Sequence, residues 1–469
     1  MKALPTEFIG RMRMLLGEDG FARYEKALSE PSFRAFRVNT DKIPLGEFEA
    51  AADFEVEKIP YVQNGYFFKC DRIGNHPFHH AGMIYVQECA AMMPAECLDI
   101  SPEWRILDLC AAPGGKSSQL KNKLGDNGLL VSNEIVPSRC KILVGNVERL
   151  GLLNTVITCE GPEKIAKEYP KYFDMIMVDA PCSGEGMFRK EEIAIDEWSV
   201  DNVKRCAVRQ AQILENAAKA LKNGGYIVYS TCTFSLEENE MVVDSFLSAH
   251  PEFEILPVKD CVRENSEDGI LFEGCQCKNI GYARRVYPHT GRGEGQFMAL
   301  LHNVSEQDEK NYPTASSKKQ KRERTANIKS VTAKDGAEMK SVTDFLDGVL
   351  TSYDRSAVKL RNGCAVYLSH EFIQGDVTVF SCGVNIGEVK KSYIQPHHNL
   401  FMALGSRFKR KLELPIDSEE LKKYFHGEEL LVDLDDGWAA VTVCGCAVGG
   451  VKVVSGVAKN HYPKGLRTK

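Results

Sequence analysis

Between residues 101 and 234, short apolar runs rich in β-branched residues alternate with segments of helical periodicity, and this alternation constrains the fold more than any other feature of the sequence. Such a pattern predicts strands joined by crossover helices, which form a parallel sheet. The expected strands are residues 105–109, 129–133, 155–159, 174–179 and 226–230, and the expected helices include 137–150 and 200–222. The predicted fold class is therefore α/β, with a Rossmann-like core.

A capping-box pattern follows the last expected strand. Ser235 and Glu238 are three residues apart and precede an apolar-periodic segment, which predicts a helix over residues 236–250. In a capping box, each side chain binds the backbone N–H of the other residue. We therefore expect Ser235 and Glu238 to contact each other.

The chain has 469 residues, too many for one compact core. Residues 305–336 are rich in Ser, Thr, Lys, Gln and Glu, which is typical of a linker, and a helix over 342–350 and a β-rich region that includes the run DVTVF follow. The predicted division is an N-terminal α+β extension (1–75), a core (76–303), a linker (304–336), an intermediate α/β segment (337–385) and a β-rich module (386–469).

The net charge of −6 excludes a protein that coats nucleic acid indiscriminately, because such binding needs an excess of Lys and Arg. Nucleic-acid contacts would have to be local, and basic patches at 318–324, 407–411 and 456–469 are candidates, although charge runs are often only solvated faces. Neither a signal peptide nor an apolar stretch of membrane-span length is present, and the sixteen cysteines are scattered. We expect a cytoplasmic monomer with reduced thiols and no membrane contact.

An apolar strand, a Gly-rich turn and a helix follow one another over residues 104–124, which brings backbone close to a ligand at the end of a strand. Gly114 and Gly115 leave room for the ligand, and Pro113 stiffens the turn. A phosphate-binding P-loop requires glycine at the position of Cys110, and the dinucleotide pattern of three spaced glycines is missing. A nucleoside cofactor without phosphate, such as S-adenosylmethionine, fits what remains.

Glu134 ends the second expected strand, where a carboxylate can accept hydrogen bonds from both hydroxyls of a ribose. A glutamate at a strand end is often just a solvated cap. Because Glu134 follows the Gly-rich turn within one strand–helix–strand unit, the ordered pair favours an adenosine-containing ligand.

Two cysteines follow two neighbouring strands. Cys182 comes just after the fourth expected strand, together with Asp179, and Cys232 comes just after the fifth. The carboxyl ends of such strands converge on the ligand crevice, so both thiols should face the cofactor turn. Most free cysteines are buried and inert, but this placement favours a chemical role.

One reaction that needs a reactive thiol is methylation of cytosine at carbon 5. This carbon is a poor nucleophile, and covalent catalysis is a common remedy for a difficult single step. A thiolate of Cys232 that adds to carbon 6 makes carbon 5 reactive toward a methyl donor. Asp179 is suited to handling the proton at ring nitrogen 3. Cys182 then assists release of the product.

Three motif blocks carry a family resemblance: LDLCAAPGGKSSQL, VDAPCSGEGMFRK and YSTCTFSLEENE. With them the chain resembles the Sun (Fmu) family of RNA cytosine-C5 methyltransferases. The resemblance implies a class I methyltransferase core and the same roles for Cys232, Cys182 and Asp179, with Asp179 between the cofactor and the base. It implies that S-adenosylmethionine contacts Cys110, Ala111, Ala112, Pro113, Gly114, Gly115, Lys116, Glu134 at the ribose, Arg139, Glu160 near the adenine, and Asp179.

The resemblance spans about residues 33–302 and includes FRAFRVNT, MIYVQECAAMMPAECL and RVYPHTGRGEGQFMALL. The later segments VNIGEVKKSYIQPHHNLFMAL and NHYPKGLRTK look like the C-terminal extension of the subgroup that modifies small-subunit (16S) ribosomal RNA. That extension is PUA-like, an RNA-binding module. The implied partner is 16S rRNA or a small-subunit particle, and the N-terminal extension is expected to bind RNA as well.

Three other functions remain open. A transfer-RNA cytosine-C5 methyltransferase would share all these features, an amine or hydroxyl methyltransferase would not need two cysteines, and an RNA-binding ribosome-assembly factor would transfer no methyl group. The pairs Cys275/Cys277 and Cys444/Cys446 lack the C-x-x-C spacing of zinc sites, so we expect structural thiols and no metal.

Overall fold

The computed structural model describes residues 2–306, 333–390 and 393–468. Most of the expected linker and the basic segment 318–324 lie outside the described residues. Among the helices that are described, none combines the length and the apolar character needed to cross a membrane.

A ten-stranded mixed sheet forms the centre of the molecule, in the order β11-β12-β13-β9-β8-β5-β6-β7-β16, with β10 paired to β13. Its parallel part consists of β5 (Arg105–Asp108), β6 (Leu129–Asn133), β7 (Thr155–Thr158), β8 (Phe173–Asp179) and β9 (Leu221–Thr231). Antiparallel strands extend it: β10 (Phe253–Leu256), β11 (Glu267–Asp268), β12 (Arg284–Val286) and β13 (Gln296–Asn303). The predicted α/β, Rossmann-like core is confirmed.

Successive residues of the parallel strands pack into two separate cores, one on each face of the sheet. In β5, Ile106 packs on one face and Leu107 on the other, and in β8 Met175 and Ile176 divide in the same way. Strands that are buried on both faces need continuous apolar runs, which is why these segments read as strands in the sequence. Helices cover both faces, so the carboxyl ends of the strands are where a ligand can reach the sheet.

The helices of the core are α4 (Gly115–Lys123), α5 (Pro137–Leu150), α6 (Pro162–Glu168), α7 (Glu192–Glu197), α8 (Val200–Ala220), α9 (Glu240–Ala249) and α10 (Asp260–Arg263). The buried positions of α8 form one stripe with helical spacing, at Val203, Cys206, Gln210, Ile213, Leu214, Ala217 and Ala220. This stripe turns toward the sheet and places Gln210 beneath the loop that follows β8.

The N-terminal region combines α1 (Thr6–Ser29), α2 (Leu45–Ala51) and α3 (Pro77–His80) with an antiparallel sheet in the order β2-β3-β1-β4. Its strands are β1 (Ala35–Val38), β2 (Glu55–Lys58), β3 (Gly65–Lys69) and β4 (Ile84–Val86). The sheet therefore includes a strand beyond residue 75. Phe8 and Tyr24 of α1 pack against Trp198 and Phe234 of the core. The helix α1 thus supports the loop that follows β9.

The C-terminal region contains two sheets, β14-β15-β17-β18 and β19-β21-β22-β23-β20. The first consists of β14 (Val358–Arg361), β15 (Cys364–Tyr367), β17 (Val384–Val389) and β18 (Ile394–Pro396), preceded by α12 (Ala333–Val349) and followed by α13 (His398–Leu404). The second consists of β19 (Lys411–Glu413), β20 (Leu430–Leu431), β21 (Gly437–Val443), β22 (Cys446–Val454) and β23 (Val457–Asn460), with α14 (Glu419–His426). The prediction of a β-rich PUA-like module is confirmed, and β17 crosses residue 386.

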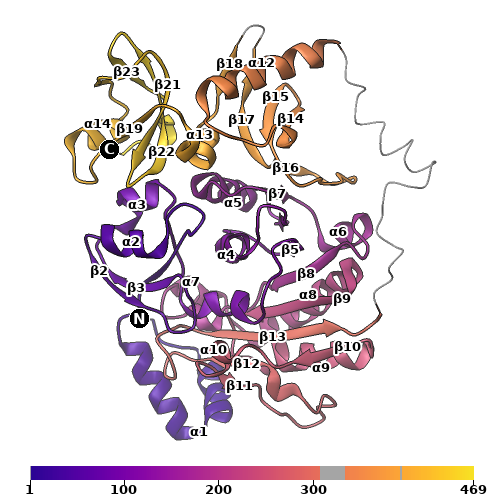
Figure 1. Ribbon diagram of the computed structural model, residues 1–469. Helices are drawn as coiled ribbons and strands as arrows, with labels where there is room; N and C mark the ends of the chain where they lie inside the picture. Colours follow the sequence, from indigo (N-terminus) through magenta and orange to yellow (C-terminus); the bar gives the residue numbers. More distant parts are fainter. Residues whose placement is uncertain (1, 307–332, 391–392, 469) are drawn as a thin grey trace.

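The two ends of the chain share one apolar core. Phe36 and Phe78 of the N-terminal region belong to the same buried cluster as Tyr424 and Val441 of the C-terminal region. His80 adds a hydrogen bond between its Nδ1 and the hydroxyl of Tyr462, at 2.9 Å. Figure 1 shows the indigo N-terminal region, with α3, lying against the yellow C-terminal module.

The run DVTVF, which was expected in the β-rich region after the linker, joins the central sheet instead. It leads into β16 (Val379–Cys382), which pairs antiparallel with β7 and extends the central sheet. The strand β7 would otherwise be an edge with unpaired backbone groups, so a later segment of the chain can cover it. The intermediate segment is therefore attached to the core by a strand.

Candidate functional site

Three polar residues singled out in the sequence meet at the carboxyl ends of the parallel strands, together with Asp108, which the sequence analysis did not single out. Asp108 ends β5, Glu134 follows β6, Asp179 ends β8 and Cys232 follows β9. Since β5 lies between β6 and β8, and β8 pairs with β9, these four positions share one edge of the sheet. Such an edge is where open α/β sheets bind their ligands.

The Gly-rich turn is held against α5. Gly114 has a left-handed backbone (φ 112°) and would place a Cβ atom 3.0 Å from the side chain of Leu143, so glycine suits this position. The guanidinium of Arg139 donates to the carbonyl of Ala112 at 2.8 Å and pairs with Glu134 at 3.1 Å. Arg139 therefore joins the turn to the strand-ending carboxylate.

The acidic groups at this edge fit a cationic nucleoside without phosphate. Asp108 is fully buried and accepts the hydroxyl of Ser117 at 2.6 Å through Oδ2, while its Oδ1 has no hydrogen-bond partner among the described residues. Burial raises the pKa of Asp108 to about 7. Glu134 is also buried and accepts the backbone N–H of Val136. Carboxylates repel phosphate but accept ribose hydroxyls and attract a sulfonium, so this donor set suits S-adenosylmethionine.

Lys116 and Asp179 form an ion pair in the same crevice. The ammonium of Lys116, almost buried, lies 2.8 Å from Oδ2 of Asp179, and the hydroxyl of Ser230 donates to Oδ1 at 2.8 Å. The Asp179 side chain keeps about a third of its surface exposed (35%). Lys116 was placed among the cofactor contacts from the sequence, and the structure adds a contact with the carboxyl group that is expected to meet the base.

Glu160 has partners of its own. Its carboxylate accepts the backbone N–H of Thr378 at 2.6 Å and pairs with Lys164 at 3.1 Å. The contact with Thr378 holds Glu160 against the segment that leads into β16. Its contact with adenine stays a prediction.

The two thiols on the loops after β8 and β9 lie together. The sulfur atoms of Cys182 and Cys232 are 3.2 Å apart, a hydrogen-bonded distance for thiols. This hydrogen bond and burial raise the pKa of Cys182 well above that of a free thiol. Either sulfur can donate in this pair, and the raised pKa favours Cys182 as the thiol that keeps its proton.

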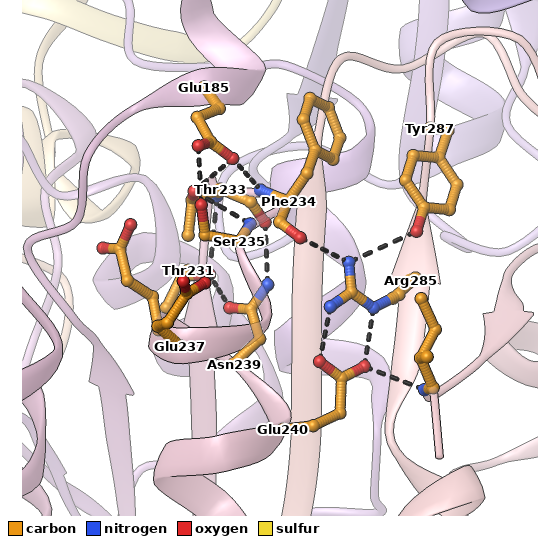
Figure 2. A network of polar contacts seen from close by, with 12 residues as sticks. Glu185, Thr231, Thr233, Phe234, Ser235, Glu237, Asn239, Glu240, Arg285 and Tyr287 are labelled. Carbon is orange, nitrogen blue, oxygen red and sulfur yellow. Dashed lines mark hydrogen bonds and ion pairs between the residues drawn. The ribbon is translucent and has the colours of Figure 1, made fainter. Parts of the chain in front are cut away.

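Two buried glutamates near the thiols were not predicted as site residues. Glu185 and Glu238 each bind the loop that carries the other cysteine, as Figure 2 shows for Glu185 and the residues Thr233, Phe234 and Ser235. Glu185 lies only three residues after Cys182, in the same motif block, and this proximity was the one available signal.

The predicted capping box is wrong. The hydroxyl of Ser235 donates to Glu185 at 2.6 Å, and Glu238 binds Ser183. Residues 236–238 form a 3₁₀ turn, and α9 begins only at Glu240. Tertiary partners have replaced the local pairing that the spacing predicts.

A buried ion pair lies at the far end of the loop that follows β9 and carries Cys232. Glu240 and Arg285 are both almost inaccessible to solvent and bind each other through two hydrogen bonds (Figure 2). Arg285 also donates to the carbonyl of Phe234 at 2.8 Å and to the hydroxyl of Tyr287 at 3.2 Å. These bonds satisfy the buried guanidinium and fix the backbone two residues after Cys232.

Metal-binding side chains do not gather elsewhere. In the described part of the chain, no group of three or more His, Cys, Asp or Glu side chains is arranged to hold a metal ion. Cys275 instead donates to Asp244 at 3.4 Å.

Three family models match successive parts of the chain. The model of the 16S rRNA methyltransferase RsmB/F matches residues 95–302, that of the N-terminal domain of the 16S rRNA methyltransferase RsmF matches 4–89, and that of the methyltransferase RsmF PUA domain matches 411–468. The matches agree with the division into an N-terminal sheet, a central sheet and a C-terminal β-rich module seen in Figure 1.

Curated relatives match over nearly the whole length. The ribosomal RNA small subunit methyltransferase F of Klebsiella pneumoniae is 30% identical, over 98% of this chain and 96% of that protein. The protein of the same name from Vibrio cholerae is 29% identical, over 99% of this chain and 98% of that protein.

Solved structures resemble the core. A methyltransferase homolog from Pyrococcus horikoshii superposes with a TM-score of 0.56 at 31% identity, covering 64% of this chain and 95% of that one. NSun6 from the same organism, solved with SFG, has a TM-score of 0.55 at 21% identity, covers 65% of this chain and 99% of that one, and shows the fold alone.

The three matched models and the relatives that match along almost the whole chain point to one family. The chain belongs to the RsmB/F family of 16S rRNA methyltransferases, in the RsmF-type form with an N-terminal domain and a C-terminal PUA domain.

Proposed function

We propose that the protein methylates carbon 5 of a cytosine in 16S ribosomal RNA, with Cys232 as covalent nucleophile and S-adenosylmethionine as methyl donor. The observation that carries the proposal is the pair of thiols 3.2 Å apart on the loops that follow the neighbouring strands β8 and β9. Transfer to an amine or a hydroxyl needs no covalent adduct, so it gives two cysteines no role. Family membership supports the same reaction and the same RNA.

Cys232 begins the reaction. Its thiolate forms a bond to carbon 6 of the base, and ring nitrogen 3 takes up a proton, which leaves electron density on carbon 5. S-adenosylmethionine supplies the electrophilic methyl group when it is bound. The S–H of Cys182 donates to the neighbouring sulfur and stabilises the thiolate of Cys232 before the attack.

Asp179 manages the proton at ring nitrogen 3. Its carboxyl group is held by the ammonium of Lys116 and the hydroxyl of Ser230, and it is exposed enough to contact a base. The ammonium of Lys116 has protons to share, so Lys116 and Asp179 together supply a proton path to nitrogen 3. Lys116 thus acts on the cytosine indirectly, through Asp179.

Cys182 completes the cycle. A water molecule takes the proton from carbon 5, and the proton on ring nitrogen 3 returns to Asp179 as the aromatic ring is restored. The bond between carbon 6 and the sulfur of Cys232 then breaks, and the sulfur leaves as a thiolate. Cys182 retains its proton because its pKa is raised, and it donates a hydrogen bond to the departing sulfur. The departing thiolate is thereby stabilised, which speeds release of the product.

The Gly-rich turn and the ends of the parallel strands bind the cofactor. We propose that residues 110–116 surround S-adenosylmethionine, that Glu134 binds its ribose, and that Arg139 keeps Glu134 and the turn in register. The target cytosine must leave any helix to reach the crevice, so the substrate is RNA with an accessible or extruded base.

The regions outside the core are proposed to hold the RNA. We keep the division into residues 1–75, 76–303, 304–336, 337–385 and 386–469, with the first and last segments as RNA-binding parts around the methyltransferase core. The shared apolar core of the two ends supports this arrangement, because it joins both parts into one surface beside the site. We also propose that the enzyme is a monomer and acts in the cytoplasm, where the ribosomal RNA is found.

A strain that lacks the gene should lose one 5-methylcytosine from 16S rRNA. Bisulfite sequencing of ribosomal and transfer RNA is the measurement, and the lost signal should return with the wild-type gene but not with a gene for Cys232→Ala. If methylation disappears from transfer RNA alone, the ribosomal substrate is wrong. Unchanged methylation in both RNAs would refute the enzyme assignment.

We expect Asp179→Asn and Lys116→Met to lower kcat by about 10²- to 10⁴-fold, the usual contribution of acid–base groups. We propose that Lys116 lines the cofactor site through its backbone and gives its ammonium to Asp179, so the KM for S-adenosylmethionine should change little in Lys116→Met. Steady-state methylation of 16S rRNA measures both constants. Lys123→Met is the matched control, since Lys123 lies on the same helix and pairs with Glu96. A Lys116→Met enzyme with a raised KM and normal kcat would assign Lys116 to the cofactor alone.

A further inference from the structure

Each of the two loops that carry the thiols has a buried glutamate that binds the other loop. We call residues 180–186 the Cys182 loop and residues 232–239 the Cys232 loop. Glu185, from the Cys182 loop, binds the Cys232 loop, and Glu238, from the Cys232 loop, binds the Cys182 loop. Both carboxylates are buried, so each is bound by protein groups in place of water.

Glu185 accepts four hydrogen bonds, two at each oxygen. Oε2 accepts the backbone N–H of Phe234 and the hydroxyl of Thr233, both at 2.8 Å. Oε1 accepts the indole N–H of Trp198 at 2.9 Å and the hydroxyl of Ser235 at 2.6 Å. Three of these four donors belong to the Cys232 loop. The hydroxyl hydrogens can rotate away from Glu185, but the hydrogens of the indole and of the backbone N–H are fixed in direction.

Glu238 makes the reverse contact. Its Oε2 accepts the backbone N–H of Ser183 at 3.0 Å and the side-chain N–H of Gln210 at 2.8 Å. Its Oε1 accepts the hydroxyl of Ser183. Gln210 also donates to the carbonyl of Pro181 at 3.0 Å, so the residues on both sides of Cys182 are held.

The backbones of the two loops also touch. The N–H of Gly186 donates to the carbonyl of Cys232 at 2.8 Å, and a Cβ atom at residue 186 would lie 2.8 Å from the same oxygen. This approach leaves no room for a side chain. The position of Cys232 is therefore set by the Cys182 loop, and not only by the end of β9.

We propose that Glu185 and Glu238 are positioning residues that set the separation of the Cys182 and Cys232 sulfurs. The inference rests on the proposed function, in which Cys232 bonds to carbon 6 of the cytosine and Cys182 donates a hydrogen bond to the sulfur of Cys232. A shift of about 1 Å between groups that act together can lower a rate by 10²-fold. Loss of the contacts that either glutamate makes with the opposite loop should therefore slow the chemical step without weakening cofactor binding.

Amide replacements distinguish the two glutamates. A glutamine at residue 185 must point its NH₂ group at one of the two fixed donors, Trp198 or Phe234, whichever way it is turned. A glutamine at residue 238 can keep its oxygen on the N–H groups of Ser183 and Gln210 and donate to the hydroxyl of Ser183, which then turns to Thr233 at 2.9 Å. Burial raises the pKa of Glu238 to about 7, which agrees with a site that tolerates a neutral side chain.

The rate of disulfide formation between the two thiols measures their separation without any substrate. The full-length protein is treated with diamide, an azo compound that takes the two thiol hydrogens and becomes a hydrazine as the S–S bond forms. Mass spectrometry of the non-reduced peptides counts the Cys182–Cys232 disulfide over time. The variants are Glu185→Gln, Glu238→Gln and Glu238→Ala, with Glu96→Gln as the matched control. Glu96 is equally buried and binds Gln119 and Lys123, away from the thiols.

We expect Glu185→Gln and Glu238→Ala to slow the disulfide about tenfold or more and to lower kcat by up to about 100-fold, with an unchanged KM for S-adenosylmethionine. Glu238→Gln and Glu96→Gln should keep the wild-type rates. Wild-type disulfide formation in Glu185→Gln would overturn the proposal, and so would a Glu238→Gln variant as slow as Glu238→Ala.

A milder variant covers the case in which Glu185→Gln does not fold. Ser235→Ala removes a single donor to Glu185 and should slow the disulfide by a smaller factor, while an unchanged rate would overturn the proposal. The disulfide assay is independent of methylation. If Cys232→Ala keeps full activity, the proposed function fails, whereas the disulfide rates still decide whether the glutamates set the separation.

Discussion

Cys232→Ala should lose methyl transfer by on the order of 10⁴-fold or more, the scale on which other covalent enzymes respond to removal of their nucleophile. Without the sulfur, carbon 6 has no group to add to it, and carbon 5 stays too electron-poor to accept the methyl group. The measurement is transfer of labelled methyl from S-adenosylmethionine to 16S rRNA, together with binding of S-adenosylhomocysteine. Binding should persist, since Cys232 is not among the expected cofactor contacts.

Two further variants make the result specific. Cys261→Ala changes a cysteine of similar exposure on α10 and should leave methylation unchanged. Cys232→Ser keeps the size and the hydrogen bonding of the side chain, but a hydroxyl is a far weaker nucleophile than a thiolate, so it should be nearly as inactive as the alanine variant. Full turnover by Cys232→Ser would rule out the covalent route.

The sequence predicted the central sheet and the position of its site because the information is local. Strands buried on both faces need continuous apolar runs, and residues just past their carboxyl ends must lie at one edge. Asp179 and Cys232 could therefore be assigned to one crevice without knowledge of any long-range contact. The order of β5, β8 and β9 in the sheet then brings the two loops side by side.

The contacts that hold the thiols were not predictable in the same way. The spacing of Ser235 and Glu238 satisfies a local capping rule, yet both side chains bind residues about 50 positions earlier in the sequence. A capping box contributes about 1 kcal/mol, and a buried carboxylate left without donors costs more than that, so the tertiary contacts win. Spacing rules describe only the local alternative.

Long-range pairing explains the other differences. The strand β16 lies more than 200 residues after β7 and completes the edge of the same sheet. Phe36 and Val441 share a core although they stand at opposite ends of the chain. Neither contact leaves a periodic signal, because apolar residues in a strand look the same whichever partner they find.

Cys182→Ala should trap the reaction after methyl transfer, and a protein–RNA adduct should accumulate. The nucleophile is intact in this variant, so the bond to carbon 6 and the methylation of carbon 5 proceed. Release slows by on the order of 10²-fold or more, because no thiol donates to the departing sulfur. The adduct carries the mass of one RNA fragment plus a methyl group on the peptide that contains Cys232, and denaturing gels and mass spectrometry detect it.

The double variant Cys182→Ala, Cys232→Ala identifies the attacking sulfur. It should form no adduct, because the bond to RNA belongs to Cys232. If Cys182→Ala instead abolishes methylation and Cys232→Ala accumulates the adduct, the two thiols have exchanged roles. The raised pKa of Cys182 argues against that exchange, since a sulfur that retains its proton is a poor nucleophile and a good hydrogen-bond donor to its neighbour 3.2 Å away.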